Sequence, residues 1–367
     1  METGRRGRSQ PRLITQPPLP PGVYLHRPRR DLPWPLGEAG TRLLSRARHG
    51  IWQGLKALSV GADDEILVPA WQHGSEIEAI QRAGCKPLLY DVGRDDAEPD
   101  PDDLERCITG RTRALYLIHY LGWPRNPARW RRWCDERDLL LIEDCAQAFL
   151  ASDEGRPLGS FGSMSIYCMY KTVGIPDGAA LHCVRPVSLD QRKSGSGMRL
   201  TVRAHAEWLM QSRNLVKQMR GARKDAVSDV GGDFDLGDPH EPPTWVGRRL
   251  LPRLLSRPVA ERRRRNFLHM SERLADMTPV AWRTLPEGAS PMVYPVEVDD
   301  KRVFLRRLGE EGISGLNLWS VPHPEIAAAN LPVTEWFRAH IVGLPVHQEL
   351  RRSHLDHIAA AASSAAS

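Results

Sequence analysis

The sequence predicts an α/β protein with a mostly parallel central sheet, followed by a smaller α/β unit. Six short runs of apolar residues alternate with amphipathic segments between residues 65 and 183. Runs that are apolar at consecutive positions are typical of parallel strands, because crossover helices cover both faces of such a sheet. The length of 367 residues suits about two domains of ordinary size. A peptide-sized or disulfide-stapled module is therefore excluded.

Residues 1–35 are predicted to form a disordered arm rich in arginine and proline. The first 30 residues hold seven arginines and one glutamate, whereas the rest of the chain holds 44 basic and 44 acidic side chains. The formal net charge of +6 therefore belongs to the arm, and segments of this composition bury too little apolar surface to fold. Nucleic-acid binding would depend on the arm alone, so we predict no nucleic-acid partner and expect the rest of the chain to work without residues 1–30.

The large domain is predicted to span residues 36–245. A helix begins near His49, because Ile51, Leu55 and Leu58 recur at helical spacing. The predicted strands are Glu65–Trp71, Lys86–Val92, Arg113–Tyr120, Asp138–Asp144, Ser163–Met169 and Ala179–Cys183. Crossover helices are expected within 74–83 and 126–137. Residues 187–245 contain SGSG, GGDFDLGD and PHEPP, which indicate a mobile linking segment with one helical stretch around 204–219.

The small C-terminal domain is predicted to span residues 246–357. A charged helix is expected over 257–277, then a strand over 292–298, a helix over 301–311 and a tight turn at Gly312. A further strand and helix extend to about His357. The alanine- and serine-rich residues 358–367 are expected to fray, as chain ends commonly do.

Cysteine spacing and hydropathy predict the cellular compartment in which the protein lies. The six cysteines form no Cys-x-x-Cys pair and no zinc-finger spacing with histidine. The sequence shows no apolar core of a secretory signal and no run near the ~18 apolar residues of a membrane-spanning helix. We therefore predict a cytoplasmic protein with no structural metal and no membrane association.

Lys171 is the sharpest candidate for chemistry. It is one of seven lysines in a chain with 44 arginines, and it lies between an apolar strand and a Gly/Pro turn in MYKTVGIPDGAAL. An amine can lose its proton and act as a nucleophile, whereas a guanidinium effectively cannot. A solvated lysine at a strand end is the alternative on these residues alone.

Two further signals lie at expected ligand-binding positions. Asp144 ends the apolar run of LLLIEDCAQAF, and ligands of open α/β sheets gather at such strand ends. Gln147 lies one helical turn later, although both residues could simply cap a helix. The turn RARHG, with Arg48 and His49, precedes the first helix. Helix N-termini bind phosphate, but an ordinary basic surface turn is equally compatible.

Taken in order, these segments resemble the DegT/DnrJ/EryC1/StrS family of pyridoxal-phosphate aminotransferases, known chiefly as sugar aminotransferases. The similarity covers roughly residues 40–185 and 257–350. It is carried by ALSVGADDEILVPAW, EIEAIQRAGCKPLLYDV, RTRALYLIHYLGWP, LLLIEDCAQAF, GRPLGSFGSMSIY, YKTVGIPDGAAL and GLPVHQ. The resemblance implies fold type I of pyridoxal-phosphate enzymes, pyridoxal 5'-phosphate as cofactor and a homodimer.

The resemblance also implies a role for each residue near the cofactor. Lys171 matches the lysine that forms the internal aldimine and shuttles the proton. Asp144 matches the aspartate that keeps the pyridine nitrogen protonated, and Gln147 the residue beside the phenolic oxygen. His73 falls where the family stacks an aromatic ring on the cofactor.

At the phosphate end, Arg48 and His49 match the start of the phosphate-binding helix, and Cys168 stands where a phosphate-binding serine is usual. Arg46-Ala47-Arg48 replaces the usual Ser-Gly-Thr, so arginine would supply part of the phosphate contacts. Residues 187–245 show no match to the Asn-x-Arg segment that the partner subunit contributes in the family.

The implied reaction is amino transfer from an amino acid, glutamate in particular, to a keto substrate such as a nucleotide-linked keto-sugar. One alternative is another reaction of the same cofactor, elimination or cyclisation, in a natural-product pathway. The other is a regulatory or binding protein on the same fold. The joint presence of Lys171 and Asp144 favours the enzyme.

Overall fold

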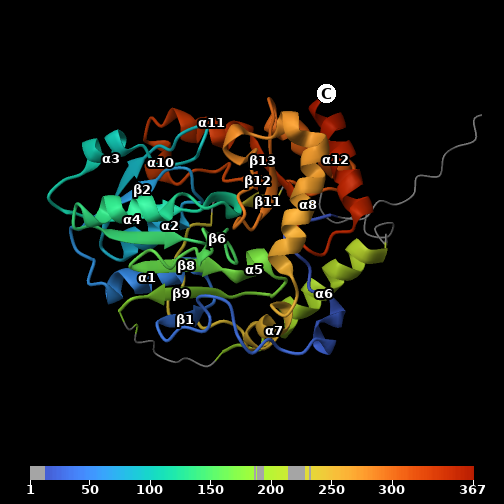
Figure 1. Cartoon of the computed structure of the whole chain (residues 1–367), viewed down its shortest axis with the longest axis horizontal. Coiled ribbons are helices and arrows are strands. Elements are labelled where there is room, and N and C mark those ends of the chain that lie inside the picture. The colour runs from blue at the N-terminus through green and yellow to red at the C-terminus, as the bar shows by residue number, and fades with distance from the viewer. Residues whose placement is uncertain (1–12, 186, 188–193, 214–227, 231–232) are drawn as a thin grey trace, which may run out of the picture.

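A seven-stranded sheet forms the centre of the larger part of the protein (Figure 1). The computed structural model describes residues 13–185, 187, 194–213, 228–230 and 233–367. Strands β3, β2, β4, β5 and β8 are parallel, and β9 lies antiparallel between β8 and β1. The strands are β1 (Thr41–Leu44), β2 (Glu65–Pro69), β3 (Lys86–Tyr90), β4 (Thr112–Ile118), β5 (Leu140–Asp144), β8 (Met164–Cys168) and β9 (Ala179–Cys183).

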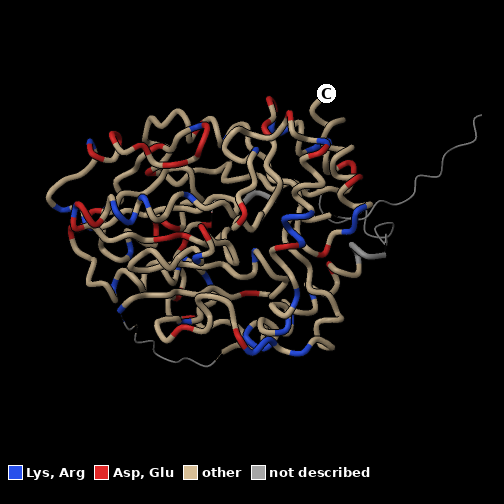
Figure 2. The backbone as a smooth tube through the Cα atoms, viewed as in Figure 1, with Lys and Arg blue, Asp and Glu red and all other residues tan. Residues whose placement is uncertain are grey.

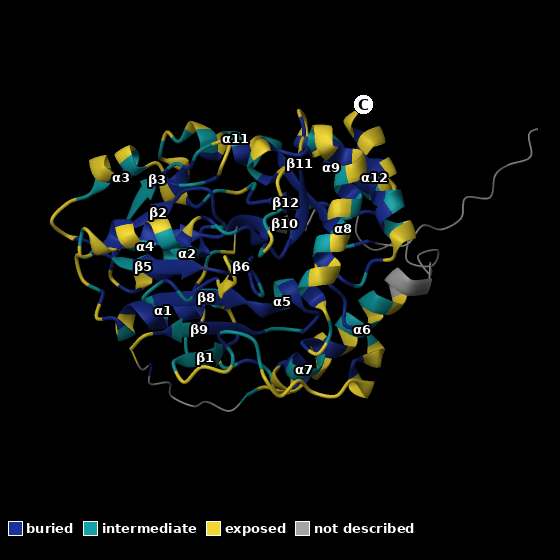
Figure 3. Cartoon of the chain, viewed as in Figure 1, coloured by how far each residue is buried: buried dark blue, intermediate teal, exposed yellow. Residues whose placement is uncertain are grey.

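All six predicted strands of this sheet are confirmed. Figure 3 colours the central strands of the sheet as buried, whereas the edge strands β1 and β3 are only partly buried. Every residue of β2 and β8 is buried, including Glu65 and Ser165. The edge strand β1 was not predicted, because four residues are too short to show alternation. The hairpin of β6 (Ser152–Asp153) and β7 (Arg156–Pro157) follows β5.

Helices connect the parallel strands, as the mostly parallel sheet requires. The predicted helices near His49 and within 74–83 and 126–137 are present as α1, α2 and α4. The helices of this part are α1 (Ala47–Ala57), α2 (Ser75–Arg82), α3 (Pro101–Cys107), α4 (Pro127–Asp135) and α5 (Met169–Thr172). No helix within the described residues is both long enough and apolar enough to cross a membrane.

A second, four-stranded sheet lies toward the C-terminus, in the order β10-β12-β13-β11. It contains β10 (Ser228–Val230), β11 (Val293–Glu297), β12 (Leu316–Leu318) and β13 (Ile341–Pro345). Helices α8 and α12 lie side by side next to it (Figure 1). The helices here are α8 (Val259–Leu274), α9 (Lys301–Glu310), α10 (Pro324–Ala327), α11 (Pro332–His340) and α12 (Arg352–Ala366). The predicted elements over 257–277, 292–298 and 301–311 are thereby found.

The C-terminal tail differs from the expected frayed end. Helix α12 continues to Ala366, and Ile358, Ala362 and Ala365 are buried in the main hydrophobic core. The alanines recur at helical spacing, so they form one apolar stripe whose small side chains let α12 approach its neighbours closely. The alanine and serine content of residues 358–367 does not show this stripe, because it ignores the spacing of the alanines.

The N-terminal arm also differs from the prediction of disorder over residues 1–35. We name residues 13–25 the strap. Leu13 forms a parallel β-bridge with Ile313, and Leu13, Leu19 and Val23 are fully buried. The Pro18 carbonyl lies so near Gly174 that a Cβ there would be 2.5 Å from its oxygen. Residues 1–12 lie outside the described part of the chain. The strap is therefore part of the fold, because Leu13, Leu19 and Val23 all occupy buried sites.

Basic residues after the strap lie beside α7 (Trp245–Leu254). The Arg29 backbone amide donates to the Pro252 carbonyl at 2.9 Å. Helix α7 adds Arg248, Arg249 and Arg253, and Figure 2 shows basic residues gathered around this helix. The positive charge of the arm thus continues onto the folded body.

The predicted mobile segment 187–245 is described only in part. Residues 188–193, 214–227 and 231–232 lie outside the described residues. Within the rest, α6 (Met198–Arg213) overlaps the predicted helical stretch. Leu236 is buried, and the Asp177 carboxylate accepts hydrogen bonds from the Thr244 amide and hydroxyl. Residues 233–245 are therefore held against the part of the protein that contains the large sheet.

Replacing Leu19 with alanine should lower the free energy of unfolding by about 3 kcal/mol, because it empties a fully buried leucine site. Leu25, in the same strap, is 90% exposed, so Leu25→Ala should change stability by less than about 0.5 kcal/mol. Denaturant titration of both variants measures the difference. Equal stabilities would show that the strap contributes nothing to the folded state.

Candidate active site

The candidate residues gather at the carboxyl edge of the parallel sheet. Asp144 is the last residue of β5, Lys171 lies in α5 directly after β8, and His73 follows β2. Because parallel strands end at the same edge, three residues distant in sequence come together. This is the edge at which open α/β sheets bind ligands.

Asp144 is a buried carboxylate, 4% exposed. One oxygen accepts the Tyr116 hydroxyl at 2.6 Å, and the other accepts the Ala146 amide at 2.8 Å. Burial, together with the neighbouring Glu76 carboxylate, raises the pKa of Asp144 to about 6, while Tyr116, Ala146 and Lys171 act in the opposite direction. Bringing a further cation to this carboxylate would therefore stabilise its charged form.

The Lys171 amine lies at this edge without a partner among the described residues. Its side chain is half-buried, and its ammonium group makes no hydrogen bond or ion pair with any residue that the structure describes. The ammonium is near enough to lower the pKa values of both Asp144 and His73. The structure thus brings Lys171, Asp144 and His73 into one electrostatic neighbourhood.

His73 has a neutral ring at neutral pH. Burial, with Lys171 and Arg48 nearby, lowers its pKa to about 4. Its Nδ1 atom is buried without a hydrogen-bond partner, and its ring lies edge-on to Phe234 with centroids 5.7 Å apart. Gly74, at φ +104, follows His73, and a Cβ there would collide with Phe234 and His323. The ring is therefore held in a crowded turn with one nitrogen left unsatisfied.

Gln147 lies near the same edge and is buried. Its Oε1 atom accepts the Leu121 amide at 2.8 Å, and its Nε2 atom donates to no described residue. The amide group is thus fixed at its oxygen, and its nitrogen remains available to a ligand.

The phosphate end of the predicted site is only partly as expected. Arg48 donates from Nη1 to the Asp233 and Asp235 carbonyls at 3.1 and 2.5 Å. The Cys168 thiol is buried, which raises its pKa, and it is hydrogen-bonded to the Tyr170 side chain. The Cys168 thiol and burial raise the pKa of the Tyr170 phenol well above its usual value, while Arg46 and Arg48 act in the opposite direction. Two arginines, a phenol and a thiol therefore converge near the start of α1.

His49 differs from its predicted role as a cofactor contact. It is buried, its Nε2 donates to the Leu236 carbonyl at 2.9 Å, and its Nδ1 is hydrogen-bonded to the Ser45 hydroxyl at 3.1 Å. Both ring nitrogens are occupied, so neither remains for a phosphate. His49 is instead a structural link between α1 and residues 233–241. Sequence spacing placed it at the right helix end but could not give the direction of its side chain.

Residues 233–241 cover the start of α1 and were not predicted at the site. Besides the contacts with Arg48 and His49, Gln53 donates to the Pro239 carbonyl at 2.6 Å, and the Ser45 hydroxyl donates to the Glu241 carboxylate at 2.9 Å. Phe234 lies between the rings of His73 and His323. The only sequence signal was the composition of GGDFDLGDPHE, which indicates a loop but not its location.

Tyr116 and Glu76 were also missed by sequence reasoning. Tyr116 lies within the apolar run of β4, where a phenol looks like one more core residue; its hydroxyl holds Asp144. Glu76 occupies the first turn of α2, where acidic residues are ordinary. A polar group two residues before the end of a central strand is the signal that could have indicated Tyr116.

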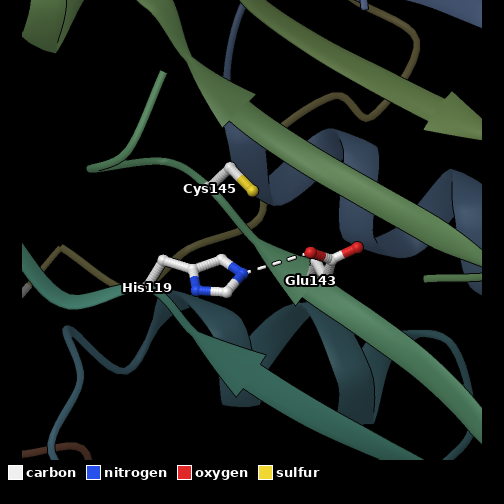
Figure 4. Close-up of side chains that lie close together, drawn as sticks. All are labelled: His119, Glu143 and Cys145. Carbon is white, nitrogen blue, oxygen red and sulfur yellow. Dashed lines mark hydrogen bonds and ion pairs between the residues drawn. The ribbon is translucent and has the colours of Figure 1, made fainter. Parts of the chain in front are cut away.

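His119, Glu143 and Cys145 form a buried cluster beside the site (Figure 4). Their ligand atoms lie within 4.8 Å of one another, but the Glu143 carboxylate already accepts the Gly159, Phe161 and Gly162 amides and the His119 ring. The His119 Nδ1 atom accepts the Arg125 amide at 3.0 Å. The cluster therefore fixes the turn 159–162 and the end of β5, one residue before Asp144.

The arrangement combines a half-buried amine, a buried carboxylate and a neutral aromatic ring at one sheet edge. An amine there can take up and release protons, and a carboxylate can hold a cationic ring nitrogen. These are the groups on which the sequence resemblance depends.

Residues 44–180 match the sequence profile of the DegT/DnrJ/EryC1/StrS aminotransferase family. The matched segment contains Asp144, Lys171 and the five parallel strands of the large sheet, but only one residue of β1 and two of β9. This part of the chain is similar to that family.

Named relatives align with either about a third or most of the chain. GDP-perosamine synthase of Escherichia coli O157:H7 is 30% identical over 126 residues, 34% of this chain and 35% of that enzyme. The aligned part thus spans about a third of that relative's length. The dTDP-3-amino-3,4,6-trideoxy-alpha-D-glucose transaminase of Micromonospora megalomicea subsp. nigra is 27% identical over 326 residues, 83% of this chain and 79% of that enzyme.

Solved structures share this fold over most of the chain. The sugar aminotransferase CalS13 from Micromonospora echinospora superposes with a TM-score of 0.66 at 21% identity, covering 95% of this chain and 99% of that one. The predicted fold, a large domain with a mostly parallel sheet and a smaller α/β unit, is confirmed.

Proposed function

We propose that the protein is a pyridoxal-phosphate-dependent aminotransferase that moves an amino group from an amino acid, glutamate in particular, to a nucleotide-linked keto-sugar. The proposal is carried by one observation: the Lys171 amine, which pairs with no described residue, lies close enough to the buried Asp144 carboxylate at one sheet edge to influence its pKa. The names of relatives, a GDP-perosamine synthase and a dTDP-sugar transaminase, support the acceptor class.

The residues present fit this cofactor. Asp144 has no cation within ion-pair distance among the described residues, so its burial is costly unless a ligand supplies a positive group. The unsatisfied Nδ1 of His73 and the free Nε2 of Gln147 are further open contacts. Arg48, together with Arg46 and the Tyr170 and Cys168 side chains, would hold the phosphate.

Each residue then has a definite task. When bound, pyridoxal phosphate supplies an electron sink for bonds at the substrate carbon. The Asp144 carboxylate would hold the proton on the ring nitrogen, and Lys171 Nζ would bind the cofactor and later move the substrate's proton. His73 would lie against the ring face, Gln147 beside the phenolic oxygen. A homodimer and a cytoplasmic location, with no nucleic-acid or membrane partner, belong to the same proposal.

The test is covalent capture of the cofactor. Purified protein should be yellow with pyridoxal phosphate, lose its visible absorption band on borohydride reduction, and carry the pyridoxyl group on the peptide that contains Lys171. Nitrogen-15 from labelled glutamate should then appear in a nucleotide-linked keto-sugar. A chain that stays colourless would indicate a binding or regulatory protein, whereas capture without amino transfer would indicate elimination or cyclisation.

A further inference from the structure

Arg263 is a fully buried arginine on α8, 1% exposed. All five of its N–H groups donate to protein oxygens. Nε donates to the Gln348 side chain at 2.9 Å, and Nη1 donates to the Pro291 and Met292 carbonyls at 2.9 and 3.2 Å. The guanidinium is thus locked at one position within the protein.

The two bonds from Nη2 reach the lysine-bearing turn. They end on the Lys171 carbonyl at 3.2 Å and the Thr172 carbonyl at 2.9 Å. Gln348 Nε2 donates to the same Thr172 carbonyl at 3.1 Å. These carbonyls are at the end of the four-residue helix α5, where the last C=O groups lack helical partners and a positive charge is favourable. Arg263 and Gln348 therefore cap the helix that carries Lys171.

The charge of Arg263 is not balanced by a carboxylate in contact with it. Among the described residues its partners are an amide and four carbonyls, and the nearby Glu349 is paired with Arg257 in a two-bond contact. Burial lowers the pKa of Arg263 to about 9. A buried, unpaired charge destabilises a fold. A planar fork with five fixed donors, however, sets the positions of its acceptors more strictly than a flexible amine would.

We propose that Arg263 and Gln348 are positioning residues for Lys171. They hold the backbone of residues 171–172, and thereby the Cα and Cβ atoms of Lys171, at a fixed position relative to Asp144. This inference rests on the proposed function, in which Lys171 Nζ must meet a cofactor atom. Neither residue touches the reacting atoms, so their effect acts through the geometry of the turn.

The expected loss follows from the sensitivity of catalysis to position. A displacement of about 1 Å in a reacting group can reduce rates by about 100-fold. Arg263→Met removes all five donors while keeping an unbranched apolar stem. We expect kcat to fall by about 100-fold with little change in KM for the acceptor, because no substrate contact is lost.

The decisive measurement does not need activity. In the cofactor-free chain, backbone hydrogen exchange of peptides covering residues 169–178 should be at least about 10-fold faster in Arg263→Met. The rate of borohydride-stable capture of pyridoxal phosphate at Lys171 should fall in parallel. Arg264→Met is the matched control: Arg264 is the next residue of α8 and donates to the Pro286 and Ala289 carbonyls, away from the turn.

Two more variants keep the proposal testable. Gln348→Leu is the variant to use if Arg263→Met does not fold. It removes the hydrogen bond that Gln348 donates to the Thr172 carbonyl and the one that it accepts from Arg263. Hydrogen exchange over 169–178 should again be faster and capture slower, both by a smaller factor. Arg263→Lys keeps the positive charge but lacks the planar set of five N–H donors. Its capture rate should therefore lie between those of Arg263→Met and the unsubstituted chain.

The outcomes separate the possible roles. Unchanged hydrogen exchange over 169–178 would overturn the proposal. Faster exchange with an unchanged capture rate would also overturn it, because Arg263 would then have a purely structural role. Absence of capture in the unsubstituted chain would overturn the proposed function instead, and the exchange measurement would still decide whether these two residues fix the turn.

Discussion

Lys171→Ala should reduce amino transfer by about 10⁴-fold or more, the effect of removing both the covalent attachment and the general acid–base group. No other described lysine lies at the carboxyl edge beside Asp144: Lys56 and Lys86 belong to α1 and to the start of β3, and Lys301 starts α9. Steady-state rates with glutamate and the keto-sugar measure the effect.

Two controls accompany this variant. The ammonium of Lys171 has no described protein partner, so Lys171→Ala should unfold at nearly the same temperature as the parent chain. Lys171→Arg keeps the charge but cannot lose a proton at neutral pH, and it should be as inactive as the alanine variant. Near-parental transamination in either variant would contradict the role assigned to Lys171.

Asp144→Asn should reduce turnover by about 10³-fold, because a charged acceptor for the cofactor's ring nitrogen becomes a neutral amide. Tyr116→Phe is the matched comparison. It keeps the carboxylate and removes only the hydroxyl that donates to it at 2.6 Å, so about a 10-fold loss is expected. Equal losses in the two variants would show that the charge of Asp144 is not what matters.

The same substitution should alter the pH dependence of stability in the cofactor-free protein. The pKa of Asp144 rises from 3.8 to about 6 on folding, so the folded chain holds a proton that the unfolded chain releases. The contribution of Asp144 to the free energy of unfolding therefore falls as the pH rises from about 4 to about 6, by at most about 3 kcal/mol. Asp144→Asn should lack this fall, which denaturant titrations at pH 4 and pH 7 would detect.

The central sheet could be predicted from sequence because each buried strand is a continuous apolar run with turn residues at its ends. The positions of Asp144 and Lys171 follow from the same pattern, since each stands where a parallel strand stops. Parallel topology then brings strand ends together without any further information. Short edge strands such as β1 lack this pattern and depend on a partner strand for their structure.

What sequence could not supply is contact between distant segments and the direction of individual side chains. His49 was placed at the correct helix end, yet its ring turns to the Leu236 carbonyl. Arg263 was one of four consecutive arginines in a charged helix, and only the fold selects it for burial against residues 92 positions away. The strap was assigned to disorder because the average composition of residues 1–35, rich in proline and arginine, conceals two leucines and one valine that are fully buried.

The strap also sets an order of events during synthesis. The Ile14 carbonyl accepts a hydrogen bond from His347, 333 residues later, and Leu13 pairs with Ile313, so the strap cannot dock until the segments around residues 313 and 347 have been synthesised. Contacts of such separation form late, and their apolar groups stay open to chaperones or to aggregation until then. A translation product that stops before residue 313 would keep that vulnerability permanently.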